Sequence, residues 1–344
     1  MTNMQLGDLA QSYQLRSQNA LLKREMADIT QELSTGRTID LAGAVRGNLA
    51  SIAGIEHDLK RLDGFETAVS ETTLLADALQ STLERVQEES EELSNTLLLA
   101  GTSYNSTIVQ SASRSAQESF KAMVDTLGAQ VAGRSLLSGT AIDQPALADA
   151  NTILDALVVA VNGSGATSAA DVVAEVDAWF ASGPSGSYDS IAFIAFPAGQ
   201  PTQKLSAVAV GANSEVTLDF TADDAEIRDI LAAAALGALV EKGVLSGDPA
   251  EQVELVTKAG ERTISAQAGL TTMRADVGAK QAALERAEQA NSASRFALEM
   301  SRNKIISVDP YESATQLEAV QIQLESLYAI TARLGRMSLV DYMR

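Results

Sequence analysis

Both ends of the chain carry a narrow apolar seam with the spacing of a coiled coil. The seam positions alternate in steps of three and four residues: Leu15, Asn19, Leu22, Met26, Ile29 and Leu33 near the start, and Leu317, Val320, Leu324, Leu327, Thr331 and Leu334 near the end. This spacing places one stripe on one side of a helix. A lone helix cannot bury its own stripe, so each end needs a partner. Because the two seams are nearly equal in length, the sequence predicts that they pair antiparallel, with the rest of the chain looped out between them.

The composition fits a helical rod better than a thick globular core. Hydrophobic residues make up 46% of the 344 residues, but aromatic residues only 4%. Such a chain fills thin helix–helix seams with Ala, Leu and Val. We therefore predict a mainly α fold, a long antiparallel coiled-coil or helical-bundle rod with paired termini and a small inserted β-rich or α+β domain.

Start and stop signals divide the helical part of the chain. The first helix is expected to end before Gly36, a good C-terminal stop. Two later helices are expected to start at Asp248-Pro249 and Asp309-Pro310, where an acid caps the helix and proline takes its first position. Between these starts, one residue in every seven forms a mostly apolar ladder with six members: Leu270, Val277, Leu284, Asn291, Leu298 and Ile305.

The composition changes between residues 141 and 224, where four of the six prolines lie. Short alternating runs at 191–193, 205–210 and 216–220 are typical of strands, and Gly211–Ser214 has the composition of a hairpin turn. A helix is expected at 151–161. Three domains follow from this division: a terminal coiled coil (1–45 with 301–344), a helical rod (46–140 with 225–300) and an inserted outer domain (141–224).

Charge and composition exclude several functions. The net charge of −20 disfavours nucleic acid and anionic membrane surfaces as partners, because both are bound through Lys and Arg. No apolar run reaches the length of a membrane span, and residues 1–11 lack the pattern of a secretory signal peptide. With no cysteine and one histidine, disulfides and His-rich metal sites are excluded. We expect no cofactor and no metal.

A search for catalytic groups gives solvated surface residues instead. His57 has no second His or Cys to act with, and the acidic run from Glu88 to Glu92 splays around a helix. Phosphate-binding glycine loops and the GxSxG elbow are absent. The polar seam residues Asn19, Asn291 and Thr331 are interpreted as determinants of register or partner number.

Three segments resemble bacterial flagellins and the related junction proteins. Glu32–Ile39 (ELSTGRTI) resembles the segment that ends the first helix of these proteins, and Gly133–Thr140 (GRSLLSGT) resembles the turn where their chains leave the rod. Ser338–Met343 (SLVDYM) resembles the ending of the hook–filament junction proteins of this family. The chain departs from the family pattern at Asp40–Ala44 and at Leu136-Leu137, which leaves the contacts of that loop open.

The resemblance implies a structural subunit of the bacterial flagellum, not an enzyme. Such a subunit leaves the cell without a cleaved signal peptide, through the flagellar type III route, and is extracellular. It implies self-association, contacts with a hook-side junction protein and with flagellin, and an export chaperone. The interface would consist of the twelve seam residues with Leu339 and Tyr342, bare in the free chain and covered by neighbouring copies.

Two rival functions remain open. One is flagellin itself, which would polymerise alone into long filaments. The other is a secretion-system tip or translocator protein, which would bind a membrane or host factor and for which no apolar span is visible.

Overall fold

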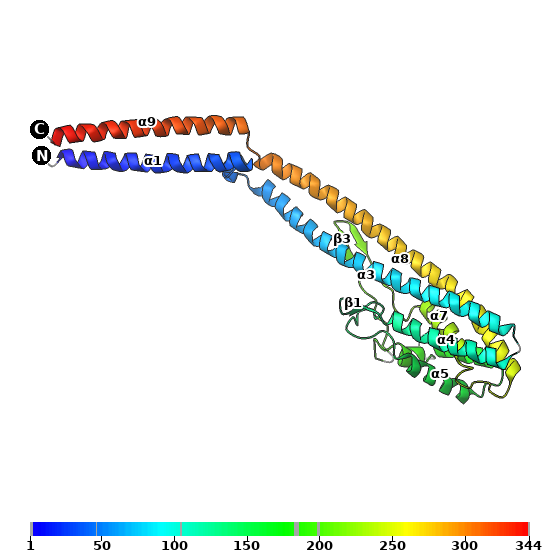
Figure 1. Cartoon of the computed structure of the whole chain (residues 1–344). Coiled ribbons are helices and arrows are strands. Elements are labelled where there is room, and N and C mark those ends of the chain that lie inside the picture. Colours follow the sequence, from blue (N-terminus) through cyan, green and yellow to red (C-terminus); the bar gives the residue numbers. More distant parts are fainter. Residues whose placement is uncertain (1–2, 46, 104, 182–185, 198–199, 343–344) are drawn as a thin grey trace. The chain divides into compact units, whose positions relative to one another are not determined.

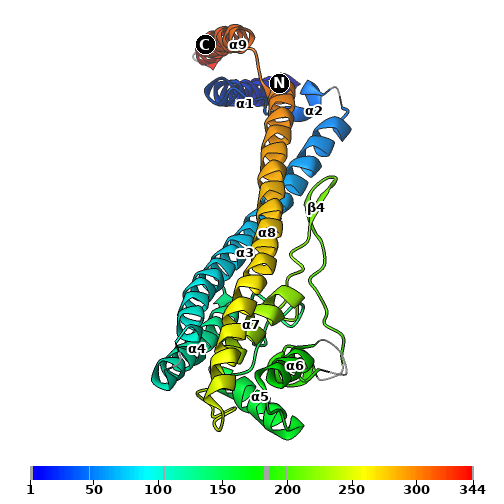
Figure 2. The same ribbon diagram turned by 90° about the vertical axis from the view of Figure 1, so that its right-hand side faces the viewer.

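The computed structural model is mainly helical, as predicted (Figures 1 and 2). It describes residues 3–45, 47–103, 105–181, 186–197 and 200–342, and for 3–9, 11, 12, 44 and 334–342 it describes the backbone alone. By their internal contacts the residues form two compact units. We call them unit 1, residues 1–63 with 292–344, and unit 2, residues 64–291. Two long helices contribute to both units, α3 (Ala50–Gly101) and α8 (Pro249–Ile306).

Unit 1 contains an antiparallel pair of helices, α1 (Asn3–Thr35) and α9 (Pro310–Tyr342). The start of α1 and the end of α9 lie side by side at one end of the pair (Figure 1). A short helix, α2 (Leu41–Ala44), follows α1, and Asp40 caps it. The predicted antiparallel pairing of the termini is confirmed.

The turn after α1 is held by a glutamate within the helix. Gly36 has a φ of +66°, the left-handed conformation that ends many helices. The Glu32 carboxylate accepts hydrogen bonds from the Ile39 amide at 2.8 Å and the Thr38 hydroxyl at 3.1 Å. The Thr38 amide in turn donates to the carbonyl of Ile306 at 2.8 Å. The end of α1 is thereby tied to the junction that precedes α9.

The core of unit 2 lies among α3, α8, α4 (Ser106–Leu127) and α7 (Ala225–Ala238), and buried side chains from residues 137–195 belong to the same cluster. The alanine-rich helix α7 is almost completely buried, and its small side chains allow α4 to approach closely. The Ser113 hydroxyl links the two helices, because it donates to the Gly237 carbonyl at 2.7 Å and accepts from the Glu241 amide at 2.8 Å.

The ladder of α8 faces the interior of the fold over most of its length. Leu270, Val277 and Leu284 are buried, whereas Asn291, Leu298 and Ile305 are half-buried. Polar side chains flank the ladder: Arg274 donates to Gln87 of α3 at 2.6 Å. The start of α8 at Pro249 and of α9 at Pro310 confirms both predicted start signals.

The chain leaves and re-enters the helical core at one place. After α4 a hairpin of β1 (Gln130–Val131) and β2 (Arg134–Ser135) carries the chain outward. The returning chain meets it where the Ala222 amide donates to the carbonyl of Leu137 at 2.9 Å. Everything between these two residues is a single excursion from the core.

The excursion is α+β rather than β-rich. It contains α5 (Ala150–Ser164), α6 (Ala169–Phe180) and the single π-helical turn η1 (Tyr188–Ala192). The helix expected at 151–161 is confirmed as α5. Helix α6 was not predicted, and the alternating run 191–193 lies at the end of η1, not in a strand.

Helix α6 has a start signal that is visible in the sequence. The Ser168 hydroxyl accepts from the Asp171 amide, and the Asp171 carboxylate accepts from the Ser168 amide, which forms a capping box. Glu251 of α8 adds a third contact by accepting from the Ala169 amide at 2.6 Å. The alternation at 191–193 covers only three residues, too few to distinguish a strand from a buried turn.

The predicted hairpin around Gly211–Ser214 is confirmed. Strands β3 (Val208–Gly211) and β4 (Ser214–Val216) pair antiparallel, and their buried side chains pack on α3 and α8. Figure 2 shows the hairpin beside the two long helices.

Candidate subunit interface

The paired helices α1 and α9 bring most of the predicted seam together. Its members fall into three groups: Ile29, Val320, Leu324 and Leu327 are buried, Leu15, Asn19, Leu22, Met26 and Leu317 are half-buried, and Leu33 and Thr331 are exposed. The side chains of Leu334, Leu339 and Tyr342 lie outside those that the structure describes. Within one chain, only the middle part of the seam is buried between α1 and α9. Most of the other seam residues that the structure describes are partly accessible to solvent.

One polar seam residue, Asn19, takes part in a contact between the two helices. The phenol of Tyr328 is hydrogen-bonded to Asn19 and to Lys23, and these bonds lower its pKa. The Lys23 ammonium lies 6.0 Å from the centre of the Tyr328 ring, a cation–π distance. Thr331 instead donates to the Leu327 carbonyl of its own helix at 2.7 Å. Asn19 therefore has a partner on the other helix, whereas the Thr331 hydroxyl bonds within its own helix, and the register role of both residues stays a prediction.

Large apolar side chains are exposed throughout unit 1, most of them outside the predicted seam. Of the 18 large hydrophobic residues exposed in the described chain, 11 belong to unit 1, which holds about a third of the sequence. They are Tyr13, Leu21, Leu33, Ile39, Leu49, Phe296, Met300, Tyr311, Ile322, Tyr328 and Ile330. Apart from Leu33, the sequence analysis missed them as interface candidates, because it followed only the dominant seam.

The net charge also differs between the two units. Unit 1 has 13 Lys and Arg against 14 Asp and Glu, a net charge of −1. Unit 2 has 12 Lys and Arg against 31 Asp and Glu, a net charge of −19. Copies of the chain therefore repel one another through unit 2 far more than through unit 1. Unit 1 combines exposed apolar area with near-neutrality, which is the condition for close packing of identical chains.

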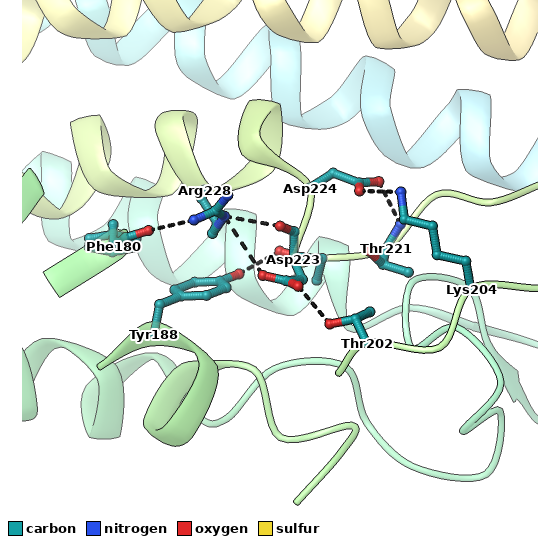
Figure 3. Close-up of polar contacts among 9 residues, drawn as sticks. Phe180, Tyr188, Thr202, Lys204, Thr221, Asp223, Asp224 and Arg228 are labelled. Atoms are coloured by element: carbon teal, nitrogen blue, oxygen red, sulfur yellow. Dashed lines mark hydrogen bonds and ion pairs between the residues drawn. The ribbon is translucent and has the colours of Figure 1, made fainter. Parts of the chain in front are cut away.

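A separate polar cluster fixes the base of the excursion in unit 2 (Figure 3). Arg228, near the start of α7, donates to the carbonyls of Asp223 at 2.9 Å and Phe180 at 3.0 Å. The Tyr188 hydroxyl donates to the Ala222 carbonyl at 2.6 Å. These bonds attach the end of α6 and the start of η1 to the segment that enters α7.

Two carboxylates extend this cluster. Asp223 accepts from the Thr202 hydroxyl at 2.6 Å, and Asp224 accepts from the Lys204 ammonium at 2.7 Å (Figure 3). Burial raises the pKa of Asp223, and the neighbouring Asp189 raises it further. The hydrogen bonds run between segments of the same chain, so the cluster is suited to holding the excursion in place.

Other kinds of site are not found in the part of the chain that the structure describes. No three His, Asp or Glu side chains there are arranged to hold a metal ion. Nor is any of the described helices long and apolar enough to cross a membrane.

Comparison with known proteins places both ends of the chain in one family. Residues 8–141 match the bacterial flagellin N-terminal helical region, and residues 262–343 match the bacterial flagellin C-terminal helical region. Together these matches cover more than half of the sequence. No curated protein matches the chain as a close relative.

A solved structure with a similar fold comes from Vibrio parahaemolyticus and is described as a flagellar hook-associated protein. The two chains share 16% sequence identity with a TM-score of 0.50, and the match covers 75% of this chain and 97% of the other. At this identity the likeness concerns the fold alone.

Proposed function

The chain belongs to the bacterial flagellin family and is a structural subunit of the flagellum, and we propose that it is the hook–filament junction protein, hook-associated protein 3. In this role it joins copies of itself into a layer between the hook-side junction protein and flagellin. It is exported with a dedicated chaperone and without a cleaved signal peptide. The ending Ser338–Met343, which resembles that of the junction proteins, favours this assignment over flagellin.

The observation that carries the proposal is the coincidence of exposed apolar area and near-neutral charge in unit 1. Identical subunits pack closely where apolar side chains are free and net charge is small. We assign the inner layer of the assembly to residues 1–45 and 301–344, the surrounding rod to 46–140 and 225–300, and the outer domain to 141–224.

The terminal pair alone is weakly held, which favours folding that is completed by assembly. Only Ile29, Val320, Leu324 and Leu327 are buried among the seam residues that the structure describes. Long helices with so few buried contacts draw little stability from one another. The half-buried seam residues and the apolar residues on the outer faces then make the contacts between copies.

Truncation tests the proposal. The purified full chain and a variant lacking residues 1–40 and 305–344 are incubated alone and with isolated hooks, and the products are observed by electron microscopy and sedimentation. The full chain is expected to add a short layer to the hooks, and the truncated chain is expected to stay folded but monomeric. Circular dichroism provides the folding control.

Two outcomes would overturn the proposal. Rings or tubes formed by the truncated chain would show that the terminal helices are not the interface. Long filaments formed by the full chain alone would identify it as flagellin, the alternative within the same family.

A further inference from the structure

Within unit 1, α3 and α8 run side by side (Figures 1 and 2). The inward faces are closed by Ile52, Leu59 and Leu62 of α3, which are buried, and by an ion pair between Arg295 of α8 and Asp63 of α3. Residues on the opposite side of each helix point away from the contact between α3 and α8. The two outward faces therefore form opposite edges of the helix pair.

The outward face of α8 carries two protruding apolar side chains. Phe296 and Met300 are 66% and 57% exposed. They stand four residues apart, so they lie one above the other on the same side of the helix. A large aromatic ring and a flexible thioether exposed together are typical of a contact surface. We call this pair the ridge.

The outward face of α3 carries small side chains at the same helical spacing. Ala50, Ala53 and Gly54 are exposed there, followed by His57. A Cβ added at Gly54 would meet no atom within 4 Å. A glycine inside an exposed helix weakens that helix relative to alanine, and nothing within the described chain requires its small size here. We call this face the shelf.

We propose that the ridge of one copy packs on the shelf of the next copy. The inference rests on the proposed function, since it names a contact through which the subunits would assemble. The large side chains of the ridge and the small residues of the shelf are complementary in shape. Because the two surfaces differ, each copy contacts one neighbour through its ridge and another neighbour through its shelf. Such head-to-tail contacts repeat into rings or helical arrays instead of stopping at a dimer.

The occupant is a second copy because of charge and position. Both surfaces belong to unit 1, whose net charge is −1, so identical chains approach there with little repulsion. The ridge residues Phe296 and Met300 also belong to the set of large apolar residues that unit 1 exposes, as do residues of α1 and α9. Gly54 adds a third reason, because a neighbouring helix that packs closely would account for a glycine in an exposed helix.

Cysteine cross-linking tests the contact directly, since the natural chain has no cysteine. Two variants, Gly54→Cys and Met300→Cys, are assembled on hooks separately and as a mixture, then oxidised. A disulfide needs Cα atoms within about 7 Å, and the two positions lie on opposite edges of one chain. The mixture is expected to give about tenfold more cross-linked dimer than either variant alone, since only the mixture places the two cysteines at one contact. Equal yields in all three samples would overturn the proposal.

Substitutions provide a second readout. Phe296→Ala with Met300→Ala, and separately Gly54→Leu, are expected to raise the chain concentration needed for half-maximal assembly by about tenfold or more. Gly54→Leu should also make the monomer more heat-stable, because leucine favours helix more than glycine does. A more stable monomer that assembles poorly is not expected from a purely structural role.

Matched controls separate this contact from the proposed function. Leu74→Ala removes an equally exposed apolar side chain of α3 in unit 2, and Gly278→Leu fills open space beside a glycine of α8 in unit 2. Both are expected to assemble like the wild type. If the wild type assembles and the ridge and shelf variants assemble equally well, this contact is wrong while the proposed function stands. If the wild type itself does not assemble on hooks, the proposed function and this contact fail together.

Discussion

The side-chain amide of Asn291 donates a hydrogen bond to the backbone carbonyl of Val210 at 2.7 Å, which ties α8 to strand β3. Asn291 is the polar member of the otherwise apolar ladder of residues spaced seven apart along α8. The bond supplies the partner that a half-buried amide in such a ladder requires. The β3–β4 hairpin is thereby fixed at one level along the long helix.

Asn291→Ala is expected to lower the free energy of unfolding by about 1–2 kcal/mol, because the Val210 carbonyl loses its donor and the alanine cannot replace it. Urea unfolding followed by circular dichroism measures the change. Ser292→Ala, at the exposed neighbouring position, is the control and should unfold like the wild type. Equal stability of the two variants would show that the hairpin is held by its apolar contacts alone.

Two neighbouring residues of α9 separate folding from assembly. Leu324 is buried against α1, whereas Ile322 is 60% exposed. Leu324→Ala should weaken the terminal helix pair by about 2–4 kcal/mol, the usual loss for a buried leucine. Ile322→Ala should leave the monomer unchanged and reduce assembly only.

The readouts for this pair are circular dichroism at 222 nm and the fluorescence of Trp179. Loss of helix signal without a change in Trp179 is expected for Leu324→Ala, because Trp179 is the only tryptophan and belongs to unit 2. If Ile322→Ala unfolds the terminal helices as strongly as Leu324→Ala does, the assignment of the two faces is wrong.

Gly139 lies in the turn where the chain leaves the helical core, with a φ of +61°. A Cβ there would stand 2.2 Å from the carbonyl oxygen of Gln203, which also accepts the Thr140 amide. Gly139→Ala is therefore expected to lower the melting temperature by several degrees, corresponding to a loss of about 2 kcal/mol or more. Gly163→Ala, in a helix with open space around it, should not lower it.

The polar cluster at the base of the excursion predicts an unusual dependence on pH. Burial and the nearby Asp189 raise the pKa of Asp223 in the folded protein above its unfolded value. The folded state then holds the proton more tightly than the unfolded state does. The stabilising effect of this proton is complete below the unfolded pKa and is lost as the pH rises through the raised folded pKa.

Asp223→Asn, which keeps an oxygen for the Thr202 hydroxyl, should melt at a higher temperature than the wild type at pH 7. This advantage should shrink as the pH falls towards 4, because the wild-type carboxyl becomes protonated. Melting curves followed by Trp179 fluorescence measure both effects, and Asp143→Asn at an exposed position is the control. An advantage that grows on acidification would contradict the raised pKa of Asp223.

Strong periodicity and capping residues were sufficient to predict the long helices. The alternating spacing of the two seams predicted the antiparallel pair, and Gly36, Pro249 and Pro310 marked helix ends that the structure confirms. The hairpin at Gly211–Ser214 followed from turn residues between alternating runs. Each of these signals is local, so the sequence carries it without knowledge of the fold.

The missed features depend in part on contacts between distant segments. Helix α6 has a local capping box, but the helix is short, and part of its start is fixed by Glu251, which lies 82 residues away from Ala169. The turn η1 depends on the Tyr188 hydroxyl reaching Ala222. The division of each terminal helix into a buried seam and an exposed apolar face likewise requires the partner helix. Periodicity alone ranks Ile322 as an ordinary surface residue.

The meeting of the Leu137 carbonyl and the Ala222 amide has a consequence for how this chain can vary. The 84 residues from 138 to 221 start and finish at the same point, so their number is not dictated by any distance that they must span. Lengthening a closed loop costs free energy only with the logarithm of its length. Related chains are free to carry outer segments of very different size, provided that each one still covers the apolar sides of α4 and α7.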